Sequence, residues 1–358
     1  MQIYLVGGFL GSGKTTAIQQ ACALLMRRGE SVGVITNDQG QQLVDSGFIA
    51  GFNIPVQEVT NGCFCCHYSE FEKRMETLQQ AHQPSIIFAE SVGSCTDLAA
   101  TVANPLQQFH PNIKTVITVF ADAAVLPALL KGSRILHQQV NYIYKKQLDE
   151  ADVLVINKTD LLNTVQLEEV MQLVNTRFAG KVVLYQNSLQ QDDVRRWLTI
   201  LNNFQPLVTR KTLEIDYDEY GAGEVQLAWL DASLEIRSAG NHAVAIALDL
   251  INKIGFAINR YQWPVGHLKF FLNDGRGQRK ISFTLMNSPS LHVEPGSDTG
   301  SARLLINARV QTSPQALQKL IGEMINKVKT ETGCTIIEGE SAAFQPGYPK
   351  PEHRITVP

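Results

Sequence analysis

Short, continuous apolar runs alternate with longer segments of helical periodicity over the first half of the chain. Apolar runs rich in β-branched residues are typical of strands buried on both faces of a parallel sheet. The helical segments between them would cover those two faces. The pattern predicts an α/β domain with a mostly parallel sheet, whose strands are residues 2–6, 32–36, 85–89, 115–120, 152–156 and 181–185.

The pattern changes after about residue 205, where strand-like segments follow one another in pairs and only two helical segments intervene. Such pairs are typical of an antiparallel sheet that is covered on one side. We therefore expect an α/β domain at 1–205 and a C-terminal α+β domain at 206–358. The expected C-terminal elements are strands 211–218, 224–237, 265–273, 279–286, 303–311 and 334–341, helices 241–261 and 314–331, a loop at 287–301 and an extended tail from 346.

Composition narrows the class of protein. The net charge of the 358 residues is −3, and basic residues do not cluster in any segment, so we expect no nucleic-acid partner. Apolar runs are too short to span a bilayer, and the chain opens directly into its first strand without a charged leader. We therefore expect a cytoplasmic protein with no membrane partner.

The first candidate site is a phosphate-binding loop. Residues 8–15 spell G-x-x-x-x-G-K-T between the first predicted strand and a helical segment. In such a loop the backbone N–H groups surround the phosphates, the lysine neutralises the β- and γ-phosphates, and the threonine hydroxyl binds Mg²⁺. The helix N-terminus adds partial positive charge. The predicted nucleotide ligands are Gly8, Gly11, Ser12, Gly13, Lys14, Thr15 and Thr16, with Lys14 also a catalytic candidate and Thr15 a Mg²⁺ ligand.

A second motif predicts which base is bound. Asn157-Lys158-Thr159-Asp160 follows a predicted buried strand and has the N-K-x-D form. The Asp160 carboxylate can accept hydrogen bonds from the N1–H and the amino group of guanine, a donor pair that adenine lacks. Lys158 can lie along the base, and Asn157 can tie this loop to the phosphate loop. GTP is therefore the expected nucleotide, and an ATP-dependent kinase is the alternative.

A third motif, Glu90-Ser91-Val92-Gly93, ends the predicted strand 85–89. A carboxylate at this place would meet the Mg²⁺ shell or its attacking water, and the backbone N–H of Gly93 could reach the γ-phosphate. Glu90 and Gly93 therefore join Lys14 as catalytic candidates, and Glu90 is also a candidate Mg²⁺ ligand. The alternative is an acidic strand end followed by an ordinary turn.

Three of the six cysteines, Cys63, Cys65 and Cys66, fall within four positions. Thiolates favour Zn²⁺ or Cu(I), and the three could converge on one metal ion if the backbone turns there. His67, Glu58, water or a partner could supply a fourth ligand. A buried reduced cluster without a ligand and a redox pair are the alternatives. The remaining cysteines are expected to be small buried apolar residues: Cys22, Cys95 and Cys334.

Taken together, these motifs resemble the CobW-like family of metallochaperone GTPases, relatives of the urease and hydrogenase nickel-insertion GTPases. The resemblance covers residues 1 to about 190, with G-G-F-L-G-S-G-K-T-T at 7–16 and E-x-x-N-G-C-x-C-C at 58–66. The family's switch segment resembles residues 37–40 with Asp45 further on, although glutamate is more usual where Asp38 stands. The resemblance implies that Asp38 reaches Mg²⁺ or the transition metal.

The resemblance further implies a GTPase that couples its nucleotide state to the binding and delivery of a transition metal. The expected cofactors are GTP, Mg²⁺ and a transition metal, with zinc ahead of cobalt or nickel. The expected partner is a client metalloprotein or cofactor-assembly protein, and a homodimer is allowed. Hydrolysis should be slow without a partner, since no arginine finger is evident. The alternative is a nucleotide-driven assembly factor for a metalloenzyme or corrinoid protein, with a purely structural zinc.

Overall fold

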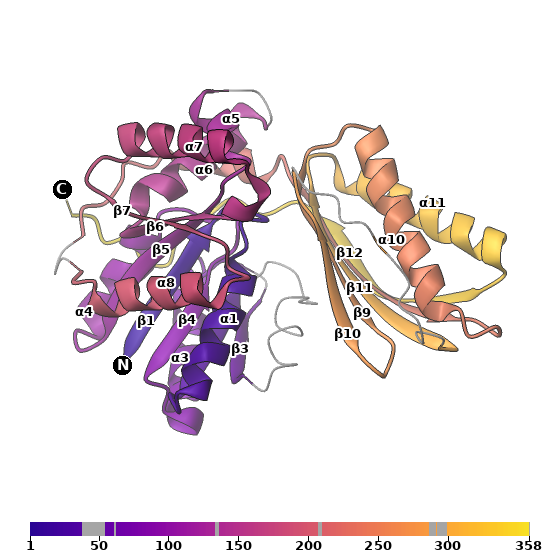
Figure 1. Cartoon of the computed structure of the whole chain (residues 1–358), viewed down its shortest axis with the longest axis horizontal. Helices are drawn as coiled ribbons and strands as arrows, with labels where there is room; N and C mark the ends of the chain where they lie inside the picture. Colours follow the sequence, from indigo (N-terminus) through magenta and orange to yellow (C-terminus); the bar gives the residue numbers. More distant parts are fainter. Residues whose placement is uncertain are drawn as a thin grey trace. The chain divides into compact units, whose positions relative to one another are not determined.

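The computed structural model describes residues 1–37, 54–60, 62–132, 136–206, 210–285, 291 and 299–357. These residues form two compact units (Figure 1). The first unit holds the described residues up to Gly223 together with the tail from Tyr348, and the second holds Glu224–Gly347. Asp38 and Asp45 lie outside the described residues.

The first unit is built on a seven-stranded sheet in the order β3-β2-β4-β1-β5-β6-β7. Neighbouring strands are parallel throughout. The strands are β1 (Gln2–Gly8), β2 (Val32–Asn37), β3 (Val56–Val59), β4 (Ile86–Glu90), β5 (Lys114–Asp122), β6 (Val153–Asn157) and β7 (Val182–Gln186). All six strands predicted for this half are therefore confirmed. The short edge strand β3 was not predicted.

Helices cover both faces of this sheet, since six consecutive residues of β1 are buried irrespective of the face to which they point. On one face α8 is anchored by Trp197, whose indole N–H donates to Thr118 Oγ1 over 3.1 Å and whose ring lies 5.1 Å from that of Phe120. The helices are α1 (Lys14–Arg27), α3 (Tyr68–His82), α4 (Asn104–Phe109), α5 (Leu126–Leu130), α6 (Gln138–Glu150), α7 (Thr164–Arg177), α8 (Gln191–Asn203) and α9 (Tyr217–Glu224), with single turns η1 (Ala99–Ala103) and η2 (Thr159–Leu161).

The second unit is an α+β fold with an antiparallel sheet in the order β10-β9-β11-β8-β12. Apolar residues of the two helices and of alternate strand positions form one core between the helices and the sheet (Figure 1). Its elements are β8 (Ala228–Arg237), α10 (Ala243–Arg260), β9 (Val265–Asn273), β10 (Gln278–Phe283), β11 (Ser301–Val310), α11 (Pro314–Thr332) and β12 (Thr335–Phe344). The predicted fold class is confirmed for both halves.

One predicted strand, 211–218, is wrong. Residues 211–216 form neither helix nor strand, and helix α9 begins at Tyr217. The Asp216 carboxylate accepts hydrogen bonds from the backbone N–H groups of Asp218 (2.9 Å) and Glu219 (3.0 Å). These bonds satisfy donors at a helix N-terminus, so the acidic residues that seemed to alternate along a strand mark the start of a helix instead.

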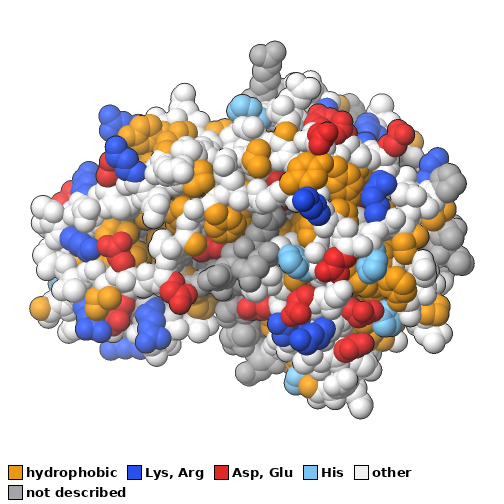
Figure 2. Space-filling view, turned by 180° about the vertical axis from the view of Figure 1, so that it is seen from behind, with side chains coloured by type: hydrophobic (Ala, Val, Ile, Leu, Met, Phe, Trp, Pro, Cys, Tyr) orange, Lys and Arg blue, Asp and Glu red, His pale blue; other side chains and the backbone are white. Residues whose placement is uncertain are grey.

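Basic and acidic side chains are interspersed with apolar ones over the face drawn in Figure 2, in keeping with the net charge of −3. Among the described residues, no helix combines the length and the apolar character that crossing a lipid bilayer requires.

Candidate functional site

The predicted motifs meet at the carboxyl edge of the parallel sheet. Gly8, Asn37, Glu90, Asp122 and Asn157 are the last residues of five of its strands. The strand register places Glu90 level with Val6 of β1 and with Thr36 of β2, and Asp122 level with Asn157. Ligands of parallel α/β sheets bind at this edge.

The phosphate loop turns from β1 into α1, and it does so around glycines. Gly13 has a φ of +93°, which favours glycine, and a Cβ there would lie 2.4 Å from Asn157 Nδ2. Lys14 Nζ donates to the Gly8 carbonyl over 2.8 Å, which holds the ammonium against the loop that would enclose the phosphates. The predicted ligands Gly8, Gly11, Ser12, Gly13, Lys14, Thr15 and Thr16 form this one continuous turn and the first residues of α1.

Two predicted Mg²⁺ ligands lie in contact. Thr15 Oγ1 donates to Glu90 Oε1 over 2.9 Å, and the two residues are 4% and 6% exposed. Oxygen ligands so close together can share one hard cation. Gly93 packs on the phosphate loop as well, because a Cβ at this position would lie 2.6 Å from Leu10 Cδ2. The segment after β4 thus lies against the loop at both ends.

The base loop is tied to the phosphate loop by Asn157, as expected for an N-K-x-D motif. Its Nδ2 donates to the Ser12 carbonyl over 2.8 Å, and its Oδ1 accepts from the N–H and the hydroxyl of Ser188. Lys158 has a φ of +64° and its Nζ lies 2.7 Å from Asp122 Oδ2. Asp160, predicted to accept from guanine, is exposed in η2.

Two residues that hold this loop in place were not predicted, Ser188 and Asp122. Ser188 follows β7 and braces Asn157, while Asp122 ends β5 and fixes the Lys158 side chain. Both come at the carboxyl end of a predicted strand, which is the signal that could have identified them.

The three clustered cysteines lie in the turn that the metal hypothesis requires. The N–H groups of Cys66 and His67 both donate to the Cys63 carbonyl over 3.0 Å, just before α3 begins. The three sulfur atoms lie within 4.8 Å of one another, and those of Cys65 and Cys66 are 3.8 Å apart. Sulfurs bound tetrahedrally at 2.3 Å are also about 3.8 Å apart. The turn therefore fits a thiophilic metal ion.

The fourth ligand considered from the sequence is not added by His67 or Glu58. In the part of the chain that the structure describes, the one group of three or more potential ligand atoms this close together consists of the three cysteines alone. Cys63 and Cys65 are buried, whereas Cys66 is partly exposed.

Asn37, which the sequence did not single out as a structural residue, holds the cysteine turn in place. Its Nδ2 donates to the carbonyls of Val59 (3.0 Å) and Gly62 (2.6 Å), and its Oδ1 accepts from the N–H of Phe64 (2.9 Å). Asn37 is the last residue of β2, and β2 pairs with β4, which ends at Glu90. The hydrogen bonds of Asn37 therefore attach the cysteine turn to the strand next to β4.

The thiols of the cluster hydrogen-bond to one another, and these bonds shift their pKa values. Hydrogen bonds donated by Cys65, Cys66 and Cys95 hold the pKa of the Cys63 thiol well below its usual range. The same bond to Cys63 raises the pKa of Cys65 well above its usual range and that of Cys66 to about 12. A divalent cation that binds here would displace the protons of the thiols.

The tail runs over the cysteine turn. The N–H of Lys350 donates to Cys66 Sγ over 3.2 Å, and the N–H of Glu352 donates to the Cys65 carbonyl over 2.9 Å. The Glu352 carboxylate then accepts from the N–H and the hydroxyl of Ser69, each over 2.8 Å. An N–H directed at a sulfur is the kind of outer contact that stabilises a thiolate ligand.

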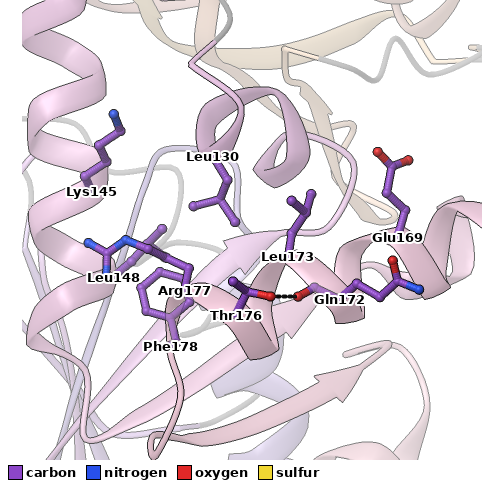
Figure 3. Close-up of a pocket in the computed structure, with 9 residues that line it drawn as sticks. All are labelled: Leu130, Lys145, Leu148, Glu169, Gln172, Leu173, Thr176, Arg177 and Phe178. Atoms are coloured by element: carbon purple, nitrogen blue, oxygen red, sulfur yellow. Dashed lines mark hydrogen bonds between the residues drawn. The ribbon is translucent and has the colours of Figure 1, made fainter.

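A separate depression lies between α5, α6 and α7, and its lining includes Leu130, Lys145, Leu148, Leu173 and Arg177 (Figure 3). The residues that line it belong to none of the loops described above, so it has no part in this site.

Comparisons with known proteins agree with these motifs. Residues 2–183 match the family model described as the nucleotide-binding domain of CobW/HypB/UreG. The zinc chaperone CobW of Sinorhizobium sp is 28% identical over 200 residues, which cover 49% of this chain and 56% of that protein. The zinc chaperone YjiA of Escherichia coli (strain K12) is 29% identical over 184 residues, or 49% of this chain and 55% of that protein.

The chain thus spans a little over half the length of these curated relatives. Among solved structures, HypB from Helicobacter pylori in complex with nickel aligns with 56% of this chain and 85% of its own, at 15% identity and a TM-score of 0.42. The family match alone extends over 182 of 358 residues, which confirms the resemblance seen in the sequence. The chain belongs to the CobW/HypB/UreG family.

Proposed function

We propose that this protein binds and hydrolyses GTP with Mg²⁺ and uses its nucleotide state to control the binding of a transition metal, which it delivers to a client protein or cofactor pathway. One observation carries the proposal. The β2 strand that holds the cysteine turn through Asn37 pairs directly with β4, which ends in the Glu90 bonded to Thr15. A phosphate-binding loop and a thiol cluster therefore share one edge of one sheet.

The phosphate loop supplies the chemistry for hydrolysis. Lys14 would neutralise charge on the β- and γ-phosphates, and Thr15 would ligate Mg²⁺. Glu90 would contribute to the Mg²⁺ shell or orient its water, and Gly93 would donate its N–H to the γ-phosphate. Asp160 would select guanine through two hydrogen bonds. We expect slow hydrolysis by the protein on its own.

The metal cargo would bind at Cys63, Cys65 and Cys66. Sulfur ligands favour zinc, and the two curated relatives reported above are zinc chaperones. Cobalt and nickel are alternative cargoes. By the family resemblance, Asp38 would bind Mg²⁺ or the transition metal.

The experiment is a competition titration of Zn²⁺ against a chelating dye, with the empty protein, with GDP and with a non-hydrolysable GTP analogue. We expect the three zinc affinities to differ by about tenfold or more, since typical coupling free energies are 1–3 kcal/mol. Equal affinities would overturn the coupling. The variant Lys14→Ala is the matched control, because it should bind zinc like the wild type and show no response to nucleotide.

A second candidate function has some support, because Cys63 and Cys65 are only 3% and 1% exposed. A metal ion held so deeply could be structural, and nucleotide would then drive the assembly or activation of a metalloenzyme or corrinoid protein. Dialysis distinguishes a structural zinc from a cargo ion. A structural zinc stays bound, whereas a cargo ion exchanges with isotopically labelled zinc.

A further inference from the structure

A fourth cysteine, Cys95, lies at the thiol cluster although it is far from the others in sequence. Its side chain is 1% exposed, and its thiol hydrogen-bonds with those of Cys63 and Cys65. The Cys66 sulfur accepts from the Lys350 N–H. Cys95 therefore lies beside Cys63 and Cys65, although its sulfur is not among the three that lie within 4.8 Å of one another. Its addition would bring the number of sulfur ligands to four, which closes a tetrahedral zinc site.

Hydrogen bonds define the conformation of the loop that carries Cys95. The N–H of Cys95 donates to the Val92 carbonyl over 3.0 Å. Gln147 Nε2, from α6, donates to the carbonyls of Gly93 (3.0 Å) and Cys95 (2.7 Å). The sulfur is thus positioned by a defined turn and does not depend on a long flexible segment.

We propose that Cys95 is the fourth thiolate ligand of the metal site and the ligand that the nucleotide moves. The inference rests on the proposed function, since it assumes that Cys63, Cys65 and Cys66 bind the cargo. It replaces the expectation that Cys95 is merely a small buried residue.

The short sequence separation between Cys95 and the phosphate-loop contacts would connect the metal site to the nucleotide. Cys95 comes two residues after Gly93, which packs on Leu10 of the phosphate loop, and five after Glu90, which is bonded to Thr15. A γ-phosphate that draws Gly93 toward it would draw Cys95 with it. Four thiolates would hold the ion in a closed site, and the loss of Cys95 would leave three ligands and one open position for a client ligand.

X-ray absorption at the zinc edge tests this by counting sulfur ligands in the full chain loaded with one equivalent of Zn²⁺. We expect four sulfurs in the wild type, three in Cys95→Ser, and four in the control Cys334→Ser, whose cysteine lies in the second unit. With a GTP analogue the wild-type count should fall to three. The Co²⁺-loaded Cys95→Ser variant should lose about a quarter of its sulfur-to-cobalt charge-transfer absorption, one of four bonds.

The outcomes separate the two proposals. Three sulfurs in the wild type, unchanged by Cys95→Ser, would overturn the role of Cys95 and leave the proposed function intact. A chain without any sulfur-bound zinc would overturn both. Four sulfurs with and without the GTP analogue would overturn the movement of Cys95. Since the wild-type counts decide these questions, the test does not depend on how well the serine variant folds.

Discussion

The hydroxyl of Thr15 donates a hydrogen bond of 2.9 Å to the carboxylate of Glu90, across 75 residues of sequence. The bond joins the phosphate loop to the end of β4, and it places two oxygen ligands where one Mg²⁺ ion would bind. The segment that follows Glu90 leads to Gly93 and on to Cys95. In the proposed function, the six residues from Glu90 to Cys95 would therefore connect the nucleotide to the thiol cluster.

Replacing Glu90 with glutamine should slow GTP hydrolysis by about 100-fold, because the variant keeps the shape of the side chain but loses its negative charge near Mg²⁺. GTP binding should remain, since the phosphate loop is unchanged. Phosphate release under single-turnover conditions measures the rate, and equilibrium binding of a fluorescent GTP analogue measures the affinity. Glu168→Gln, on the exposed side of α7, is the control. A hydrolysis rate equal to that of the wild type would contradict the role of Glu90.

Asp160→Asn should weaken GTP binding by about 100-fold or more, because the carboxylate would be replaced by a group that cannot accept both guanine hydrogen bonds. The same variant should gain affinity for xanthosine triphosphate, whose 2-oxo group suits the amide. Competition between the two nucleotides measures the change. If ATP competed well with GTP for the wild-type protein, the kinase alternative would be favoured instead.

Asn37→Ala should weaken zinc binding by about 10- to 100-fold, the range typical of residues that support metal ligands. The substitution removes three hydrogen bonds that hold the cysteine turn, including the 2.6 Å bond to the Gly62 carbonyl. GTP affinity should stay close to that of the wild type. The control is Asn163→Ala, which removes the capping asparagine of α7 away from the site. Equal zinc affinities for Asn37→Ala and the control would show that the cysteine turn keeps its conformation without the hydrogen bonds of Asn37.

Stability should fall as pH rises from about 5 to 8. Burial, reinforced by the nearby charge of Asp97, raises the pKa of Glu150 from 4.5 to about 8. In this window the unfolded carboxyl is ionised while the folded one keeps its proton, so the unfolded state binds fewer protons and the free energy of unfolding declines with pH. The loss should reach a few kcal/mol, at about 1.4 kcal/mol per pKa unit.

The Glu150→Gln variant should remove most of this decline, because its amide does not titrate. Urea denaturation at pH 5, 6.5 and 8 measures the free energy of unfolding, with Glu168→Gln as the exposed control. If the wild type and Glu150→Gln declined equally with pH, another group would be responsible.

Removing residues 348–358 should speed metal exchange at the cysteine turn, because the Lys350 N–H on Cys66 and the Arg354–Asp97 pair (2.8 Å) would be lost. Stopped-flow transfer of Zn²⁺ to a chelator measures the rate, and we expect an increase of about tenfold. The point variant Arg354→Ala should show a smaller increase. A truncated protein that released zinc at the wild-type rate would exclude a role for the tail in retaining metal.

The local motifs of this site could be predicted from the sequence, because each consists of adjacent residues. The phosphate loop, Glu90 and Asn157 fall where strand ends were expected, whereas the three cysteines were recognised by their spacing and follow the unpredicted strand β3. Contacts between distant segments could not be predicted: Asn37 under the cysteine turn, Ser188 behind Asn157 and Cys95 beside Cys63 depend on the order of strands in the sheet.

The errors in the fold have similar causes. β3 is four residues long and only partly buried, so Val56–Val59 lacks the apolar run that marks the other strands. Residues 211–218 alternate in polarity as a strand does. The Asp216 carboxylate, however, accepts hydrogen bonds from two N–H groups at the start of α9, and the segment forms a helix start instead of a strand. Alternation over eight residues is thus weaker than a capping carboxylate.

In topological terms the second unit is an insertion, because the chain leaves the first unit at Gly223 and returns to it at Tyr348. The returning segment reaches the cysteine turn within three residues, at Lys350. The segment that covers the cysteine turn is therefore the same one by which the chain re-enters the first unit, and only two residues of sequence separate the junction at Tyr348 from the N–H that contacts Cys66.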